Sequence, residues 1–349
     1  WELHYNRGFK DHHVGGVLKY TQSAKVQTQG IGSTLENGIQ RRNQGIAGRF
    51  HYNWKYRYFI DFNFGYTGSE NFHKDYRFGF FPALSGAWNL AEEPFMENVK
   101  WMDMFKIRYS WGKTGNDDLR NSANNRDKDG NLVDGKKTPV GGYQFADIGY
   151  DRYYGGIGYL SMATPDVSWE ISTKQDLGID FSFFEDKISG SIDYYNEKRT
   201  GIYLERRHLP WTVGLSAENY KKEKQNVYAN VGEVKAHGFD GNIKLRHKIN
   251  NVDFTIRANM TYGKNEIVER DEENTVYWYK KQAGHRVGQA MGLVALGLFK
   301  DYEEIRNWPT QFGEVMPGDI KYKDINGDGK IDDNDKVAIG ATKRPNFTY

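Results

Sequence analysis

The chain has 349 residues, in which 48 Lys and Arg stand against 46 Asp and Glu, so its net charge is +2. This balance argues against a nucleic-acid-binding protein, which needs an excess of positive charge, and the absence of cysteine excludes disulfides, thiolate zinc sites and cysteine nucleophiles. The longest apolar run has nine residues, 291–299, against the roughly 20 that a transmembrane helix needs. A mean hydropathy of −0.80 with 15% aromatic residues is typical of an all-β protein with one wet face.

Alternation of apolar and polar residues with a period of two recurs along the chain and predicts β-strands. GRFHYNWK (48–55) is one clear case, with Phe50, Tyr52 and Trp54 on one face and polar side chains on the other. RYFIDFNFGYT (57–67) repeats the pattern with aromatic and aliphatic side chains on one face. Further runs of this kind lie at 104–112, 176–184, 187–195 and 252–263.

The lengths of these runs and of their connections indicate a membrane protein. The runs have about 10 to 15 residues, whereas strands of globular proteins usually have about 5–6 and membrane-crossing strands need about 9–11. Short connections stand at 10–11, 55–56, 185–187 and 250–251, and longer ones at 27–40, 68–75, 92–103, 115–167, 203–227 and from 266 onward. Short turns at one end and long loops at the other predict an antiparallel transmembrane β-barrel, present in part, with about ten or eleven strands.

The charged residues of these runs indicate which face meets lipid. In MFKIRYSWG (104–112), Lys106 and Arg108 share the face opposite the aromatic and aliphatic side chains. An Arg or Lys that faces lipid at the bilayer midplane costs about 2–4 kcal/mol, so we expect both side chains to face a watery lumen. A partial barrel would leave unpaired strand edges in lipid, which predicts that further strands come from outside this chain.

The stretch DINGDGKIDDND (324–335) has the spacing of a calcium-binding loop of the EF-hand type. Its predicted metal ligands are Asp324, Asn326, Asp328, the carbonyl of Lys330, Asp332 and Asp335. Gly329 stands at the sharp turn, and Ile331 is expected to point away from the ion. Position 12 is Asp where the pattern prefers a bidentate Glu, which predicts a weaker site. The alternative is a surface turn without an ion, because Asp, Asn and Gly favour turns by themselves.

The flanks of this loop do not have helical patterns, so a calcium sensor that opens a pair of helices is not expected. Upstream, Pro317 and Gly318 break any helix and 319–323 alternates like a strand, while the downstream stretch runs through Gly340 into Pro345. We therefore expect a structural Ca²⁺ ion in an extracellular loop of a β scaffold.

Six segments, taken together and in order, resemble the SusC/RagA family of TonB-dependent outer-membrane transporters. They are RFGFFPALSGAWNLAEEPFM (77–96), FKIRYSWGKTGND (105–117), PDVSWEISTKQDLGIDFSFFEDKISGSIDYYNEKRT (165–200), NVGEVKAHGFDGNIK (230–244), GHRVGQAMGLVALGLF (284–299) and PGDIKYKDINGDGKIDDNDKVAIGATKRPNFTY (317–349).

The resemblance implies a barrel of 22 strands around an N-terminal plug domain. Residues 1–349 would then be a portion of the later barrel, with the plug, the TonB box and the terminal strands outside it. It also implies import of oligosaccharides or peptides across the outer membrane, with a SusD-like surface lipoprotein over the mouth and TonB, acting through the missing N-terminal part, as the energy source. Outer-membrane lipid would surround the barrel, and no nucleic-acid partner is expected.

No catalytic residue is predicted, because the sequence has neither a GxSxG nor an HExxH motif. Candidate substrate or partner contacts in the long loops are Tyr153, Tyr154 and Trp211, for which the alternative is an aromatic girdle at the membrane interface. Two other functions remain open on the residues alone. One is a surface or adhesive β-domain stabilised by calcium, and the other is a TonB-dependent receptor for a metal chelate.

Overall fold

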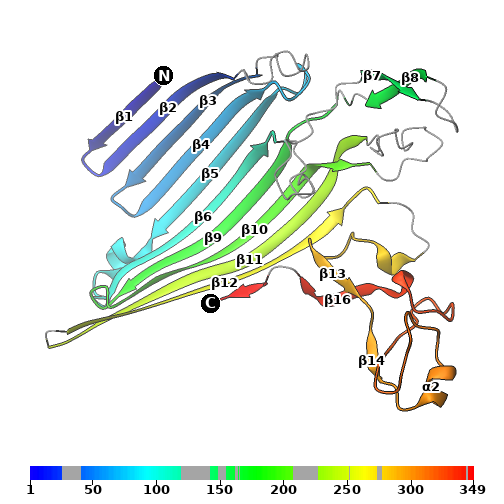
Figure 1. Cartoon of the computed structure of the whole chain (residues 1–349). Coiled ribbons are helices and arrows are strands. Elements are labelled where there is room, and N and C mark those ends of the chain that lie inside the picture. Colours follow the sequence, from blue (N-terminus) through cyan, green and yellow to red (C-terminus); the bar gives the residue numbers. More distant parts are fainter. Residues whose placement is uncertain are drawn as a thin grey trace.

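The computed structural model of the chain describes residues 1–25, 41–118, 142–147, 155–161, 164, 166–206, 227–250, 252–272, 277–342 and 345–349. Its main body is one antiparallel sheet of 11 strands, in which each long strand lies beside the next along the chain (Figure 1). The predicted all-β, antiparallel architecture is confirmed. No helix of the described residues is long and apolar enough to cross a membrane.

Six strands of this sheet coincide with the six alternating runs predicted above, and each of the six is longer than its run. In chain order the strands of the sheet are β1 (Glu2–Phe9), β2 (His12–Lys25), β3 (Arg41–Trp54), β4 (Tyr58–Ser69), β5 (Phe78–Asn89), β6 (Met102–Asn116), β9 (Glu170–Phe183), β10 (Ile188–Glu205), β11 (Tyr228–Ile249), β12 (Val252–Glu269) and β17 (Phe347–Thr348). With 22 residues, β11 has about twice the length that a membrane-crossing strand needs. Part of it therefore extends beyond a bilayer.

The two faces of the sheet differ in chemistry, as the alternation predicts. One face, called the outward face here, carries exposed apolar side chains such as Ile60, Phe62 and Tyr109. The other, called the lumen face, carries the charged side chains, among them Arg108, which is ion-paired with Asp180 and Asp193. Lys106 is on this face too, with its Nζ 4.4 Å from the centre of the Phe59 ring. Lys106 and Arg108 therefore share the face opposite the exposed apolar side chains, as the alternation predicts.

The short turns all lie at one end of the sheet and have left-handed backbone. Lys55 and Tyr56, between β3 and β4, have φ of 51° and 54°, and Asn250, between β11 and β12, has φ of 53°. Positive φ in a tight hairpin turn matches the right-handed twist of the strands it joins. The connection between β5 and β6 contains the short 3₁₀ helices η2 (Leu90–Glu92) and η3 (Pro94–Met96).

Buried side chains are few, because both faces of the sheet are open along most of its length. The small core cluster of Phe72, Val167, Trp169 and Tyr203 lies at the end of the sheet opposite the short turns. Within it the ring of Trp169 packs 5.1 Å from that of Phe72. The cluster joins the turn after β4 to the segment that enters β9, so it fixes the strand ends near the long connections.

The long connections carry structure of their own. β7 (Gly142–Asp147) and β8 (Gly155–Ser161) form a hairpin within the predicted loop 115–167. The chain after β12 is more ordered than the predicted loop from 266 onward. It contains η5 (Trp278–Lys280), β13 (Gln289–Gly292), β14 (Ala295–Leu298), α2 (Tyr302–Arg306), β15 (Ile320–Tyr322), η6 (Asp333–Asp335) and β16 (Val337–Thr342).

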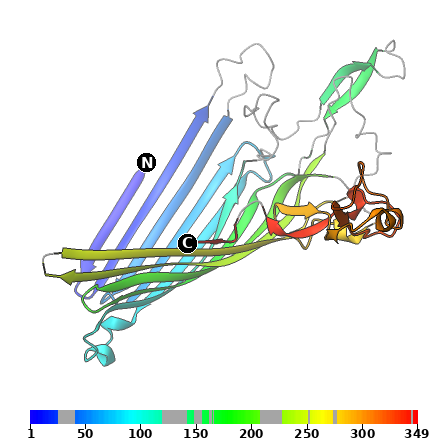
Figure 2. The ribbon, with the colours of Figure 1, turned by 60° about the horizontal axis from the view of Figure 1, so that its bottom comes forward.

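Residues 277–342, called the outer segment here, gather beside the end of β12 that is remote from the short turns (Figure 2). β13 pairs with β16 and β14 with β15. An ion pair of 2.6 Å between Lys321 Nζ and Glu304 Oε1 joins β15 to α2. Two-residue β17 then returns to the main sheet and pairs with β12 at two positions.

Candidate functional site

Arg108 lies at the centre of an ionic cluster on the lumen face of β6, β9 and β10. Its Nε and Nη2 donate to the two carboxylate oxygens of Asp180 at 2.9 and 3.0 Å. Its Nη2 is also 2.7 Å from Asp193 Oδ1, and its Nη1 is 3.7 Å from Asp176 Oδ1. Three carboxylates around one guanidinium make this part of the wall locally acidic.

The backbone makes room for this cluster at Gly178, the register partner of Arg108 in β9. A Cβ added to Gly178 would lie 2.2 Å from Asp193 Oδ1 and 2.7 Å from Arg108 Cζ. No side chain fits there, so the glycine allows the guanidinium to cross β9 and reach β10.

A hollow of about 290 Å³ adjoins the cluster. It is lined by Phe59, Asp61, Ser85, Gly86, Ala87, Lys106, Arg108, Tyr109, Ser110 and Asp176. Carboxylates, cations, hydroxyls and an aromatic ring together can hold a polar solute by hydrogen bonds and ring contacts. The hollow therefore offers groups that can bind a polar solute on this face of the sheet.

The acidic loop 324–335 is compact, and its side chains are held by the backbone of the same loop. Asp324 accepts hydrogen bonds from the N–H groups of Gly327 and Gly329 at 2.7 and 2.9 Å. Both glycines have positive φ, 76° and 81°, which an L side chain rarely adopts. Asn326 and Asp328 each accept from the N–H two residues further on, at 3.0 and 2.8 Å. Such turns are typical of Asp and Asn.

Asp335 anchors the end of the loop and is fully buried. Its carboxylate accepts from the N–H of Ile325 at 2.7 Å and from that of Asp332 at 2.9 Å. Burial by itself raises the pKa of Asp335, but the N–H groups of Asp332, Ile325 and Asn326 outweigh it and hold this pKa below its ordinary value. The negative charge is therefore stable inside the loop.

The inner side of the loop packs as the sequence predicts. Ile331 is 3% exposed. Its N–H donates to the carbonyl of Thr310 at 2.8 Å, and the N–H of Thr310 donates to the carbonyl of Gly329 at 3.0 Å. Lys330 lies opposite Thr310 in this parallel bridge. The flanks are the strands β15 and β16, as expected for a loop on a β scaffold.

The predicted calcium ligands thus lie together in one ordered loop, with an oxygen-rich donor set that suits calcium. Their carboxylates point to backbone N–H groups, and within the described residues no three His, Asp or Glu side chains form a group that could hold a metal ion. Calcium binding at these residues stays a prediction.

A second segment, 277–280, for which the sequence predicts no role, clamps this loop. The Tyr279 hydroxyl donates to the carbonyl of Asn334 at 2.8 Å, and Lys280 Nζ donates to Asn334 Oδ1 at 2.7 Å. The Tyr277 hydroxyl accepts from Asn326 Nδ2 at 3.2 Å. Between these tyrosines Trp278 is 80% exposed. No local pattern in the YWYK sequence (277–280) predicts this role. Its partners Asn326 and Asn334 lie about 50 residues further along the chain.

The candidate contacts Tyr153, Tyr154 and Trp211 lie outside the described residues, so they too stay predictions. The acidic partners of Arg108 were not predicted. The alternation within their runs places Asp176, Asp180 and Asp193 on the same face as Arg108. They reach Arg108 only because β6 pairs with β9 and β9 pairs with β10.

The sequence of the chain is similar to sequences of known proteins. The family described as TonB dependent receptor-like, beta-barrel matches residues 2–339. The chain is 27% identical over 384 residues to TonB-dependent receptor P3 of Formosa agariphila, covering 99% of this chain and 36% of that protein. It is also 27% identical over 358 residues to TonB-dependent receptor SusC of Bacteroides thetaiotaomicron, covering 96% and 32%. The chain thus spans about a third of the length of these relatives.

Among solved structures, the RagAB peptide importer in its closed-closed state matches with a TM-score of 0.68 and 16% identity. The match covers 99% of this chain and 38% of that chain. At this identity the likeness is one of fold, and it agrees with the 11-stranded antiparallel sheet described above.

Proposed function

Because the chain belongs to the TonB dependent receptor-like β-barrel family, a family of outer-membrane receptors and transporters and not of enzymes, we propose that it forms part of the wall of an importer. The solutes that we propose are oligosaccharides or peptides. The observation that carries this proposal is the lumen face, where one guanidinium and three carboxylates adjoin a hollow of about 290 Å³. Polar groups of this kind suit a hydroxyl-rich or amide-rich solute.

Uptake by whole cells tests this function. A strain that lacks the complete gene and a strain that regains it are offered oligosaccharides, peptides or metal chelates as the required nutrient. The proposal expects the deletion to remove growth on one oligosaccharide or peptide class and the intact gene to restore it. A defect confined to metal chelates would contradict it.

A variant of the wall connects uptake to the described hollow. Asp176→Asn changes a lining residue whose only ion pair within the described residues is the 3.7 Å contact with Arg108, so folding is expected to persist. We expect slower uptake at normal abundance in the membrane. The matched control is Asp253→Asn, at the short-turn end of β12 and outside this hollow, which should leave uptake unchanged.

We propose that TonB and a SusD-like surface lipoprotein act with this chain. The outer segment supports a lipoprotein partner because it exposes large apolar side chains, among them Phe312 at 61% and Met316 at 59%. The test is co-purification of a lipoprotein with the complete transporter. Phe312→Ser with Met316→Ser should reduce the recovered lipoprotein, whereas Val252→Ser, also exposed but at the short-turn end, should not.

We also propose that the loop 324–335 binds Ca²⁺ and is ordered by it. Asp324, Asn326, Asp328, Asp332 and Asp335 would provide side-chain oxygens and Lys330 a carbonyl. The ion would add binding energy to the folded loop alone and so stabilise the outer segment. The clamp by Tyr279 and Lys280 would transmit that order to the exposed Trp278.

A further inference from the structure

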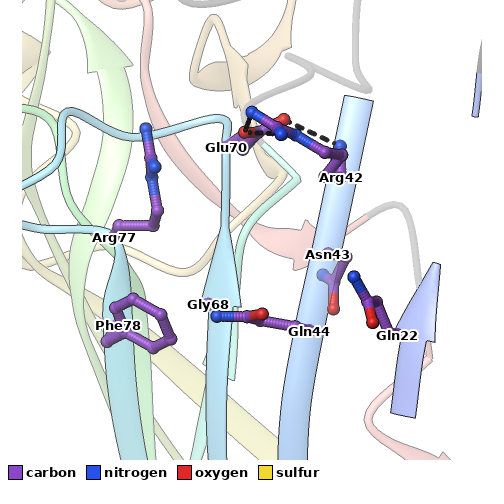
Figure 3. Close-up of a pocket in the computed structure, with 8 residues that line it drawn as sticks. All are labelled: Gln22, Arg42, Asn43, Gln44, Gly68, Glu70, Arg77 and Phe78. Carbon is purple, nitrogen blue, oxygen red and sulfur yellow. Dashed lines mark hydrogen bonds and ion pairs between the residues drawn. The ribbon is translucent and has the colours of Figure 1, made fainter. Parts of the chain in front are cut away.

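A hollow of about 270 Å³ lies on the outward face of the sheet, at the ends of β2 to β5 that are remote from the short turns (Figure 3). We call it the rim hollow. Its floor is a row of register partners across four strands, in the order Gln22, Gln44, Gly68 and Phe78. Register partners share a face. Gly68 lies two residues beyond Tyr66, so the row belongs to the lipid-facing side.

Successive rows on this face change in polarity toward the extracellular end. The row before the rim hollow is Tyr20, Ile46, Tyr66 and Phe80, all 37–55% exposed and suited to lipid chains. The next row brings two amides, and the row after it brings Arg42 and Glu70. Rows on one face are two residues apart, roughly 7 Å along a strand. The rim hollow therefore lies where the apolar band ends and lipid headgroups begin.

The hollow exists because Gly68 has no side chain. A Cβ at Gly68 would lie 2.5 Å from the ring of Phe78, so a larger residue would displace that ring. In Figure 3 the amide of Gln44 points across β4 toward this position, and the ring of Phe78 lies on its other side. The floor is thus an amide and an aromatic edge around a gap.

Two guanidinium groups and one carboxylate surround the gap, and only one guanidinium is paired. Arg42 contacts Glu70 through Nε at 3.0 Å and through Nη2 at 2.8 Å, and its backbone N–H donates to the same carboxylate at 2.9 Å. Arg77 lines the hollow, and its Nε is buried without a hydrogen-bond partner. No ion pair joins Arg77 to a carboxylate within the described residues. Among the described residues, the lining therefore carries two guanidinium charges against one carboxylate charge, and the buried Nε of Arg77 lacks an acceptor.

From this geometry we propose that the rim hollow binds the phosphate group of an outer-leaflet lipid. Arg77 would be the cationic contact, with the amides of Gln22 and Gln44 as further donors. A phosphate has only acceptor oxygens and pairs strongly with guanidinium groups. The position outside the sheet separates this site from the lumen path of the proposed importer. The inference depends on residence in the outer membrane and not on which solute is imported.

The test uses the complete protein in nanodiscs that contain a phosphorylated outer-membrane glycolipid, with native mass spectrometry to count retained lipid. The wild-type protein is expected to retain at least one lipid, and Arg77→Gln to reduce retention at least tenfold. The matched control is Arg49→Gln, which removes a guanidinium from the lumen face of β3, where it pairs with Asp61, and should retain lipid as wild type does. If Arg77→Gln does not fold, Gln44→Leu must reduce retention without changing either arginine.

Two further experiments distinguish a lipid phosphate from free inorganic phosphate as the ligand. A dephosphorylated form of the same glycolipid should be retained at least tenfold less than the phosphorylated form. Inorganic phosphate at millimolar concentration should not release the lipid. Equal retention of both lipid forms, equal retention by Arg77→Gln and wild type, or complete release by inorganic phosphate would each overturn the proposal. Uptake by Arg77→Gln should remain normal, so loss of this site and loss of the proposed transport are distinguishable.

Discussion

Arg108 in β6 holds Asp180 in β9 through two parallel hydrogen bonds of 2.9 and 3.0 Å, although 72 residues separate them in the chain. The pair fixes the register of two strands on either side of the connection 117–169. Asp193 in β10 extends the contact to a third strand. The ionic cluster thus links three neighbouring strands on one face of the sheet.

Arg108→Gln should destabilise the wall more than the loss of an ordinary ion pair. Removal of the guanidinium leaves three carboxylates facing one another in a partly buried place. We expect a loss of about 1–3 kcal/mol, below the cost of breaking a fully buried pair because the cluster is partly solvated. The measurement is the unfolding temperature in detergent micelles. Arg49→Gln, which breaks one exposed pair with Asp61, should cost less than about 1 kcal/mol, and equal losses would contradict the role of the cluster.

Gly178→Ala should disturb the ionic cluster around Arg108 because the added methyl group takes up space that the cluster occupies. The new Cβ would lie 2.2 Å from Asp193 Oδ1 and 2.7 Å from Arg108 Cζ, so the ion pairs must separate. We expect a cost of about 1–3 kcal/mol, as for other overpacked sites. Gly65→Ala is the control, because a Cβ there meets nothing within 4 Å. Equal unfolding temperatures of Gly178→Ala and Gly65→Ala would contradict the steric role of Gly178.

The outer segment should lose stability in acid through Asp335. Its pKa is held below the ordinary value, so the unfolded loop binds a proton more readily than the folded one. The stabilisation is complete above the unfolded pKa of about 3.9 and is lost as pH falls through the lower folded pKa. Amide exchange at Ile325 and Asp332, corrected for intrinsic rates, should accelerate below about pH 4.

Asp335→Asn should accelerate exchange at the same amides already at neutral pH and remove most of the acid dependence. The Asn amide group cannot accept from both N–H groups that the carboxylate now serves. Asp333→Asn is the matched control in the same 3₁₀ helix, because the Asp333 side chain is 87% exposed and pairs only with Lys336 among the described residues. If Asp333→Asn accelerated amide exchange as much as Asp335→Asn does, burial of Asp335 would not be the cause.

Calcium should bind the loop with one event of measurable heat, and chelation should lower the unfolding temperature of the outer segment. Asp324→Ala combined with Asp328→Ala removes two predicted ligands and should abolish that event. At a free calcium concentration of 100 times Kd, one site stabilises by about 2.7 kcal/mol. Identical calorimetric titrations of wild type and the double variant would refute calcium binding here.

The sequence predicts the parts of this structure that depend on local pattern. Alternation of period two locates the long strands and puts Lys106 and Arg108 on the lumen face, because facing lipid would cost too much. Breaks between the alternating runs locate the short turns, such as Lys55 and Tyr56. These features need no knowledge of what lies next to each strand.

Features that depend on distant partners could not be predicted. Asp180 and Asp193 meet Arg108 only after β6 pairs with β9 across the connection 117–169, and no local rule gives that pairing. The outer segment was expected as a loop, because β13 and β14 are four residues long and their partners β16 and β15 lie far along the chain. The clamp of Tyr279 and Lys280 on Asn334 has the same origin.

We expect the long strands to cross the outer membrane with the Tyr109 face toward lipid and the Arg108 face toward the lumen. The chain has no cysteine, so single cysteines at residues 105–111 of β6 can each carry a spin label in the complete, membrane-embedded protein. The measurement is collision of each label with oxygen, which concentrates in lipid, and with a water-soluble nickel complex. Labels at the odd-numbered positions should collide with oxygen and those at the even-numbered positions with nickel, in strict alternation. Labels that collide with nickel at every position would contradict it.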